Sequence, residues 1–146
     1  NEGCGLLATE PAGTRAMRFY PGTNVAASPT RYTMAPEEVL TALRDMEVNG
    51  WRLGAIVHSH PTTEPAPSRT DLREAYYPDA LLVIVGFAAP TPLVRGWRIR
   101  GIDGETAAVE AVVRFGADAP RADAEREAPG VPRPDATSAA ERGRSR

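Results

Sequence analysis

Short apolar runs separated by turn residues dominate the first 116 positions and predict a β-rich domain. We expect strands over residues 3–9, 14–20, 53–58, 80–87, 93–100 and 105–115. The run at 80–87 is apolar throughout, which predicts a strand buried on both faces near the centre of a sheet. Asp103 and Gly104 separate the last two runs and predict a hairpin turn.

Residues 34–49 carry the clearest helical pattern of the chain. Pro36 suits the first turn, and Gly50 stands where a C-terminal cap belongs. The apolar residues expected on the buried face are Val39, Leu40, Leu43 and Met46. A proline-rich loop is expected over 61–67, because proline lacks the N–H group that a strand ladder needs, and a short helix over 68–76.

The order of these elements favours an α+β fold, since strands and helices do not alternate regularly. A length of 146 residues predicts a single domain. Residues 117–146 are rich in Pro, Ala, Arg and acidic residues and have no aromatic residue. We therefore expect one folded domain over 1–116 and a disordered tail over 117–146.

The two histidines of the chain, His58 and His60, lie at the end of the strand expected at 53–58. Their spacing places both side chains on the same side of a strand. Asp71 follows at the start of the next expected helix. Two imidazoles and one carboxylate suit Zn²⁺, and three protein ligands leave a fourth position for water, as in catalytic zinc sites.

The pattern H-S-H, seven residues, S, two residues, D resembles the signature of the JAMM (MPN+) zinc metallopeptidases. The segments NEGCGLL and NVAASPTRYTM make the chain most similar to the bacterial Mec branch, over about residues 1–115. Members of that branch release cysteine from the C-terminus of a ubiquitin-like sulfur-carrier protein. The resemblance implies a cytidine-deaminase-like α+β fold: a mixed, curved sheet flanked by helices, with zinc at one end.

The resemblance also implies a role for each residue of the motif. His58, His60 and Asp71 are expected to hold one zinc ion per chain, Glu2 to act as general base and Ser68 to stabilise the oxyanion. Ser68 and Asp71 have the spacing of a helix-opening capping box as well, and the two roles can coexist. In the family a helix precedes the glutamate, and we expect it to be missing here because the chain begins at Asn1.

Several further residues keep more than one interpretation. Cys4 can be a nucleophile, a zinc ligand or a buried inert residue; the last is favoured, since free cysteines are usually buried and both histidines serve the metal. Asn24, Ser28 and Tyr32 belong to the Mec-like segment, where a place along the substrate groove and a purely structural role are both open.

The sequence thus predicts a zinc-dependent hydrolase that cleaves the amide bond between the C-terminal glycine of a sulfur carrier and cysteine, in cysteine biosynthesis. The alternatives are a deubiquitinase-like isopeptidase of other specificity and a non-catalytic MPN interaction scaffold. A purely structural zinc module needs a fourth protein ligand, for which only Cys4 is available.

Composition limits which binding partners and which cellular compartment we expect. A net charge of −2 gives no basis for nucleic-acid binding, and the longest apolar run, 80–89, is too short to span a bilayer. The start of the chain has no signal-peptide pattern, and a single cysteine excludes an internal disulfide. We therefore expect a cytoplasmic protein whose partner is the ubiquitin-like carrier. All 17 basic residues are arginine, which excludes a catalytic lysine.

Overall fold

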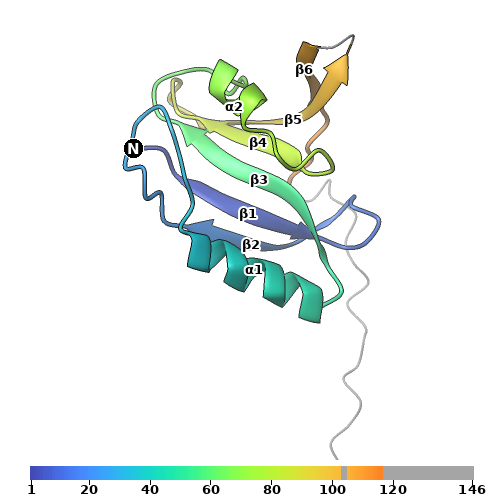
Figure 1. Ribbon diagram of the computed structural model, residues 1–146. Helices are drawn as coiled ribbons and strands as arrows, with labels where there is room; N and C mark the ends of the chain where they lie inside the picture. Colours follow the sequence, from blue (N-terminus) through green and yellow to red (C-terminus); the bar gives the residue numbers. More distant parts are fainter. Residues whose placement is uncertain (103–104, 117–146) are drawn as a thin grey trace, which may run out of the picture. The chain divides into compact units, whose positions relative to one another are not determined.

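Figure 1 shows a computed structural model of the chain, which describes residues 1–102 and 105–116. The chain divides into two units, Asn1–Val113 and Arg114–Arg146. The expected hairpin turn at 103–104 and the expected tail at 117–146 lie outside the described residues.

A six-stranded sheet in the order β2-β1-β3-β4-β5-β6 forms the first unit. Its strands are β1 Cys4–Thr9, β2 Ala16–Gly22, β3 Arg52–His60, β4 Leu81–Gly86, β5 Leu93–Ile102 and β6 Glu105–Ala111. Across the described strands, neighbours pair antiparallel except β3 and β4, which run parallel. This mixed sheet with few helices confirms the α+β prediction, and β4 lies centrally as expected.

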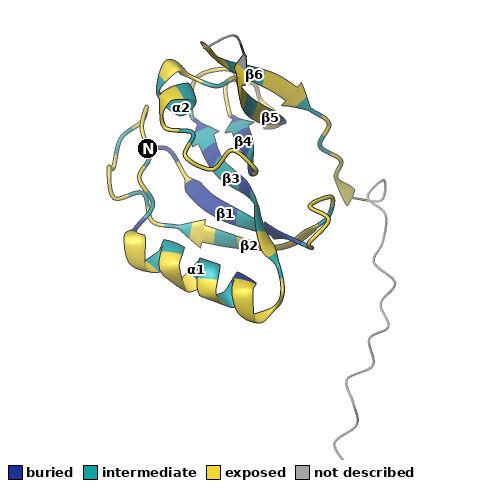
Figure 2. Ribbon diagram, turned by 45° about the vertical axis from the view of Figure 1, so that its right-hand side comes forward, coloured by how far each residue is buried: buried dark blue, intermediate teal, exposed yellow. Residues whose placement is uncertain are grey.

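The longer helix, α1 (Pro36–Val48), packs against β1, β2 and β3. The cluster beneath it consists of Leu6, Ala8, Ala42 and Met46, and Figure 2 shows the opposite side of the helix exposed. The short helix α2 (Arg69–Arg73) lies in the crossover between β3 and β4. No helix within residues 1–102 and 105–116 is long and apolar enough to cross a membrane.

The C-terminal end of α1 confirms the role predicted for Gly50. This glycine adopts a positive φ of 68°, which favours glycine. Its N–H group donates to Glu47 O, and the N–H group of Trp51 donates to Met46 O. These two hydrogen bonds form a Schellman motif that ends the helix and turns the chain into β3.

One of the four apolar residues expected on the buried face of this helix is instead exposed. Leu40 is 49% exposed, whereas Ala42 is 2% exposed and takes its place in the core. Met46 and Leu43 define the centre of the buried face together with Val39. Leu40 lies one residue, about 100° of helical rotation, beyond Val39 and so reaches the edge of that face.

Several element boundaries also differ from the prediction: β2 spans Ala16–Gly22 rather than 14–20, and β5 continues to Ile102 rather than ending at residue 100. β3 continues to His60 because β4 runs beside it and pairs His60 with Gly86. Helix α2 ends at Arg73 rather than at residue 76, since Glu74 leaves the helical conformation with ψ 18°. β6 ends at Ala111 rather than at residue 115, where its pairing with β5 stops opposite Gly96.

Candidate metal centre

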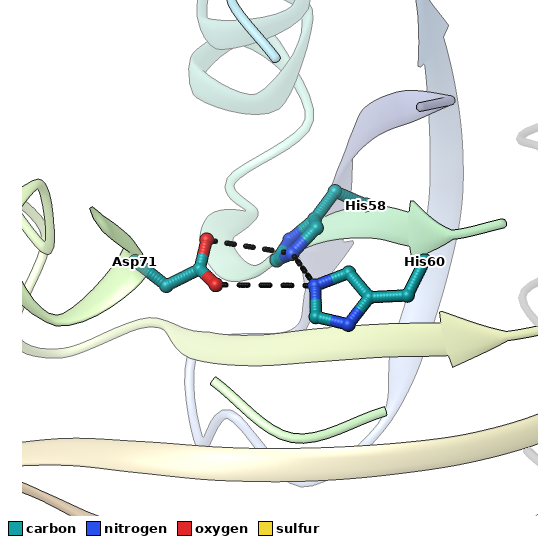
Figure 3. A group of neighbouring side chains, drawn as sticks. All are labelled: His58, His60 and Asp71. Atoms are coloured by element: carbon teal, nitrogen blue, oxygen red, sulfur yellow. Dashed lines mark hydrogen bonds and ion pairs between the residues drawn. The ribbon is translucent and has the colours of Figure 1, made fainter. Parts of the chain in front are cut away.

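Strand β3 brings the two histidines to one end of the sheet, where its parallel pairing with β4 ends. Alternation along the strand places His58 and His60 on the same face as Ile56, which packs against the core beneath α1. Both side chains are buried, with 1% and 7% of their surface exposed. Their Nε2 atoms lie 3.1 Å apart and point toward each other (Figure 3).

Asp71 reaches the two imidazoles from α2, and a capping box fixes its position. The Ser68 N–H group donates to Asp71 Oδ2 at 2.7 Å, and the Asp71 N–H group donates to Ser68 Oγ at 3.2 Å. Asp71 Oδ1 then lies 3.4 Å from His58 Nε2, and Oδ2 lies 3.9 Å from His60 Nε2. The capping role predicted for Ser68 and Asp71 is therefore present, and it aims the carboxylate at the histidines.

The protonation of the histidines follows from their surroundings. His60 Nδ1 lies 2.9 Å from Glu64 O. A carbonyl oxygen only accepts, so Nδ1 of His60 carries a hydrogen and Nε2 is the ring nitrogen that faces His58. Burial lowers the pKa of His58 to about 4, against the opposing effect of Asp71, so this ring is neutral near pH 7. Its buried Nδ1 has no hydrogen-bond partner among the described protein atoms.

The three side chains together fit a zinc ion. Ligand atoms of a tetrahedral zinc site, each about 2.0–2.1 Å from the metal, lie about 3.3–3.4 Å from one another. One donor atom from each of His58, His60 and Asp71 lies within 4.8 Å of the others, and two of the separations are 3.1 and 3.4 Å. Two imidazoles and one carboxylate are a donor set of catalytic zinc sites, which keep a fourth position open.

Glu2 lies in the same cleft, just before β1 begins. Its side chain is 7% exposed and lines the cleft together with His60, Ser68 and Asp71. Burial raises the pKa of the Glu2 carboxyl; His60 lowers it and the negative charge of Asp71 raises it further. The structure therefore brings together every residue that the sequence singled out for the site.

The cleft itself is narrow. Its volume is about 230 Å³, below the roughly 300–1,000 Å³ of pockets for drug-sized ligands. His60 and Asp71 line it together with the segments 29–32 and 61–63 and residues after α2. Such a space suits the end of an extended chain better than a bulky small molecule.

Tyr32 lies against the first of the two histidines. Its ring stacks on His58 with centroids 4.6 Å apart and planes 19° from parallel. Tyr32 lines the cleft, whereas Asn24 and Ser28 do not line it. Those two residues hold the loop instead: Asn24 Nδ2 donates to Glu2 O, and Ser28 O accepts from the Glu2 N–H group.

Two contacts near the centre were not predicted from the sequence. Trp97 Nε1 donates to Pro65 O at 2.9 Å and so ties the proline-rich loop to β5. Arg31 lines the cleft beside Tyr32 and forms an ion pair with Glu74. Neither has a local sequence signal, because each contact joins segments more than 30 positions apart.

Cys4 lies opposite His58 in the β1–β3 register and is buried. Its Sγ lies 3.6 Å from Gly22 O, and burial, with the charges of Glu38 and Glu2, raises the pKa of the thiol. A buried thiol with a raised pKa is a poor nucleophile. The favoured interpretation of Cys4 as a buried inert residue agrees with this environment.

Comparison with known proteins identifies the family of the chain. Residues 1–100 match the family described as prokaryotic homologs of the JAB domain. The CysO-cysteine peptidase of Mycobacterium tuberculosis is 40% identical over 105 residues, which cover 71% of this chain and 70% of that protein. The desampylase of Haloferax volcanii is 36% identical over 57% of this chain and 60% of its own length.

Solved structures of similar sequence share the fold of this chain. A Desulfitobacterium hafniense protein superimposes with a TM-score of 0.65 at 34% identity, covering 81% of this chain and 82% of that chain. A Salinibacter ruber protein superimposes with a TM-score of 0.55 at 28% identity, covering 82% and 81%. The chain therefore belongs to the family of prokaryotic JAB-domain proteins.

Proposed function

We propose that this protein is a zinc-dependent hydrolase that cleaves the amide bond between the C-terminal glycine of a ubiquitin-like sulfur carrier and cysteine, in cysteine biosynthesis. The observation that carries the proposal is the convergence of two imidazoles and a carboxylate in a cleft that also contains Glu2. The 40% identity to a CysO-cysteine peptidase supports the substrate.

His58, His60 and Asp71 would hold one Zn²⁺ per chain. When bound, the ion supplies Lewis acidity, which lowers the pKa of water and polarises a carbonyl group. Two of the three ligands are already oriented by hydrogen bonds, His60 by Glu64 O and Asp71 by the Ser68 N–H group. Such outer partners fix the ligand geometry and usually affect metal affinity.

Glu2 is placed to move protons. Its buried carboxylate lines the cleft beside His60 and Asp71, so it can accept a proton from the attacking water. The same group can then deliver that proton to the nitrogen of the departing cysteine. The hydrogen bond from Asn24 to Glu2 O and the bond from the Glu2 N–H group to Ser28 O hold the backbone that carries it.

Ser68 can stabilise the oxygen that becomes negatively charged during the reaction. Its Oγ already accepts the Asp71 N–H group. The hydroxyl hydrogen is therefore directed away from the helix cap and is free to donate to a substrate oxygen in the cleft. One such donor typically contributes about 10²–10³ in kcat.

A narrow cleft suits the glycine end of a carrier protein. Glycine has no side chain, so its backbone can approach the ligands His60 and Asp71 closely. Glycine and cysteine are both small, which suits a cleft whose whole volume is about 230 Å³. Binding energy from the folded part of the carrier can then position the bond.

An isopeptidase that cleaves protein conjugates is the second candidate. The similarity to the Haloferax desampylase and to a probable TtuB-protein conjugate cleaving protease of Thermus thermophilus favours it. The latter is 43% identical over 51% of this chain and 49% of its own length. A non-catalytic scaffold is disfavoured, because the donor set for a metal and the glutamate are present in one cleft.

We place the reaction in the cytoplasm, with the carrier as protein partner and with neither nucleic acid nor membrane involved. The charge of −2 and the single, buried cysteine support this environment.

The decisive experiment compares two substrates. The zinc-loaded protein is incubated with a carrier–cysteine adduct and, separately, with a carrier joined to a lysine side chain or with di-ubiquitin, and the products are followed by mass spectrometry. We expect the carrier–cysteine adduct to be cleaved and the linked chains to remain largely intact. The reverse outcome would favour the isopeptidase, and cleavage that persists in a zinc-free His58→Ala variant would remove the metal mechanism.

A further inference from the structure

Acidic side chains outnumber arginines among the residues that line the cleft. Glu2, Asp71 and Glu74 contribute carboxylates to its lining. Among the described residues that line the cleft, Arg31 is the one arginine, and the chain has no lysine. The three carboxylates would repel a negatively charged substrate group, so Arg31 is the lining side chain best suited to bind an anion that enters the cleft.

Asn24 holds the backbone of Arg31 beside that of Glu2. Its Nδ2 donates to Glu2 O and to Arg31 O, both at 3.0 Å. Its Oδ1 accepts from the N–H groups of Ala26 and Thr33. One half-buried amide thus closes the loop and fixes the start of the Arg31 side chain next to the Glu2 backbone, just before β1 begins.

The side chain of Arg31, in contrast, is weakly held. Its Nη2 lies 3.1 Å from Glu74 Oε1, and the two side chains are 59% and 38% exposed. An exposed pair of this kind contributes little to stability. A guanidinium group binds a carboxylate in bidentate geometry, so a better-placed carboxylate can replace Glu74.

The proposed substrate carries such a carboxylate. Cysteine joined through its amino group to the carrier has a free α-carboxylate two bonds beyond the scissile nitrogen. A lysine joined through its side chain has no charged group at this position. The presence of an anion so close to the reacting bond therefore distinguishes the two substrate classes of the candidate reactions.

We propose that Arg31 binds the α-carboxylate of the C-terminal amino acid that the enzyme releases, and that Glu74 occupies this position until the substrate arrives. This inference rests on the proposed function and makes Arg31 a specificity-determining residue. It directs the site toward a single terminal amino acid rather than toward an isopeptide bond.

The test uses the full-length, zinc-loaded protein and a ubiquitin-like carrier ending in Gly-Gly that is extended by one cysteine. The cysteine is supplied either as the free acid or as the carboxamide, so that the substrates differ only in the terminal charge. We expect kcat/KM of the wild type to be at least about tenfold higher for the acid, as for hydrogen bonds between charged groups. Both substrates are followed by mass spectrometry.

Variants then assign the preference to one residue. Arg31→Ala should cleave the acid slowly and the carboxamide at about the wild-type rate, and Arg31→Lys should restore part of the preference because it keeps the charge. Glu74→Gln, which removes the resident partner, should retain the full preference. Arg73→Ala is the matched control, since Arg73 is exposed on α2 and lies outside the cleft lining.

Equal cleavage of acid and carboxamide by the wild type, or a preference that survives in Arg31→Ala, would overturn the inference. Cleavage of neither substrate would instead defeat the proposed reaction. Calorimetric titration of both carrier forms into the wild type and Arg31→Ala then tests the contact between Arg31 and the α-carboxylate without relying on cleavage. Tighter binding of the acid that is lost in Arg31→Ala supports it, and equal binding of both forms overturns it.

Discussion

The phenol ring of Tyr32 stacks on the imidazole of His58, with centroids 4.6 Å apart and planes 19° from parallel. His60, the other histidine of the centre, is oriented by a hydrogen bond from its Nδ1 to Glu64 O. The buried Nδ1 of His58 has no such partner among the described residues. His60 is oriented by a hydrogen bond, whereas the His58 ring is oriented by the stacking of Tyr32 on its aromatic face.

This relationship predicts different effects for two substitutions of Tyr32. Tyr32→Ala removes the ring and should weaken zinc binding about 10- to 100-fold, as loss of an outer partner usually does. Tyr32→Phe keeps the stack and should bind zinc within about threefold of the wild type. Competition with a chromophoric chelator measures both affinities. Equal affinity in Tyr32→Ala and the wild type would show that the ring only covers the site.

The role of general base that we propose for Glu2 can be separated from zinc binding by the substitution Glu2→Gln. The amide keeps the shape of the side chain but cannot accept a proton, so activity should fall about 10²–10⁴-fold. Zinc content by elemental analysis and the melting temperature should remain close to those of the wild type. Unchanged turnover would assign proton transfer to another group.

The buried face of α1 predicts a contrast between two apolar residues of the same helix. Met46 is 2% exposed in the core beneath α1, and Met46→Ala should lower the free energy of unfolding by about 2–5 kcal/mol. Leu40 is 49% exposed, and Leu40→Ala should change it by no more than about 1 kcal/mol. Urea denaturation measures both. Similar losses would mean that the helix packs through a wider face.

Removal of residues 117–146 should leave the melting temperature and turnover nearly unchanged. The expectation rests on sequence alone, since this segment is polar, rich in proline and without aromatic residues. Calorimetry and the carrier–cysteine assay compare the shortened and full chains. A marked fall in either quantity would indicate that the segment docks on the domain.

The sequence alone determined the fold class and the members of the candidate centre. The apolar runs located all six strands, because hydrophobic periodicity is a local property of the chain. Pro36 and Gly50 marked the ends of α1, since their backbone preferences do not depend on distant contacts. The spacing of His58, His60 and Asp71 sufficed to name three residues that the fold brings within 4.8 Å.

The tertiary structure decided how far the elements extend and what surrounds the centre. β3 reaches His60 only because β4, more than 20 positions later, pairs with its end. The stack of Tyr32 on His58 and the Arg31–Glu74 pair likewise join segments that are distant in sequence. Such contacts depend on the crossover that folds the chain back over the sheet, and no periodic pattern encodes them. For this reason the sequence predicted the candidate ligands and the capping box at Asp71, while only the fold revealed Tyr32 and Glu64 O beside the histidines and the Arg31–Glu74 pair in the cleft.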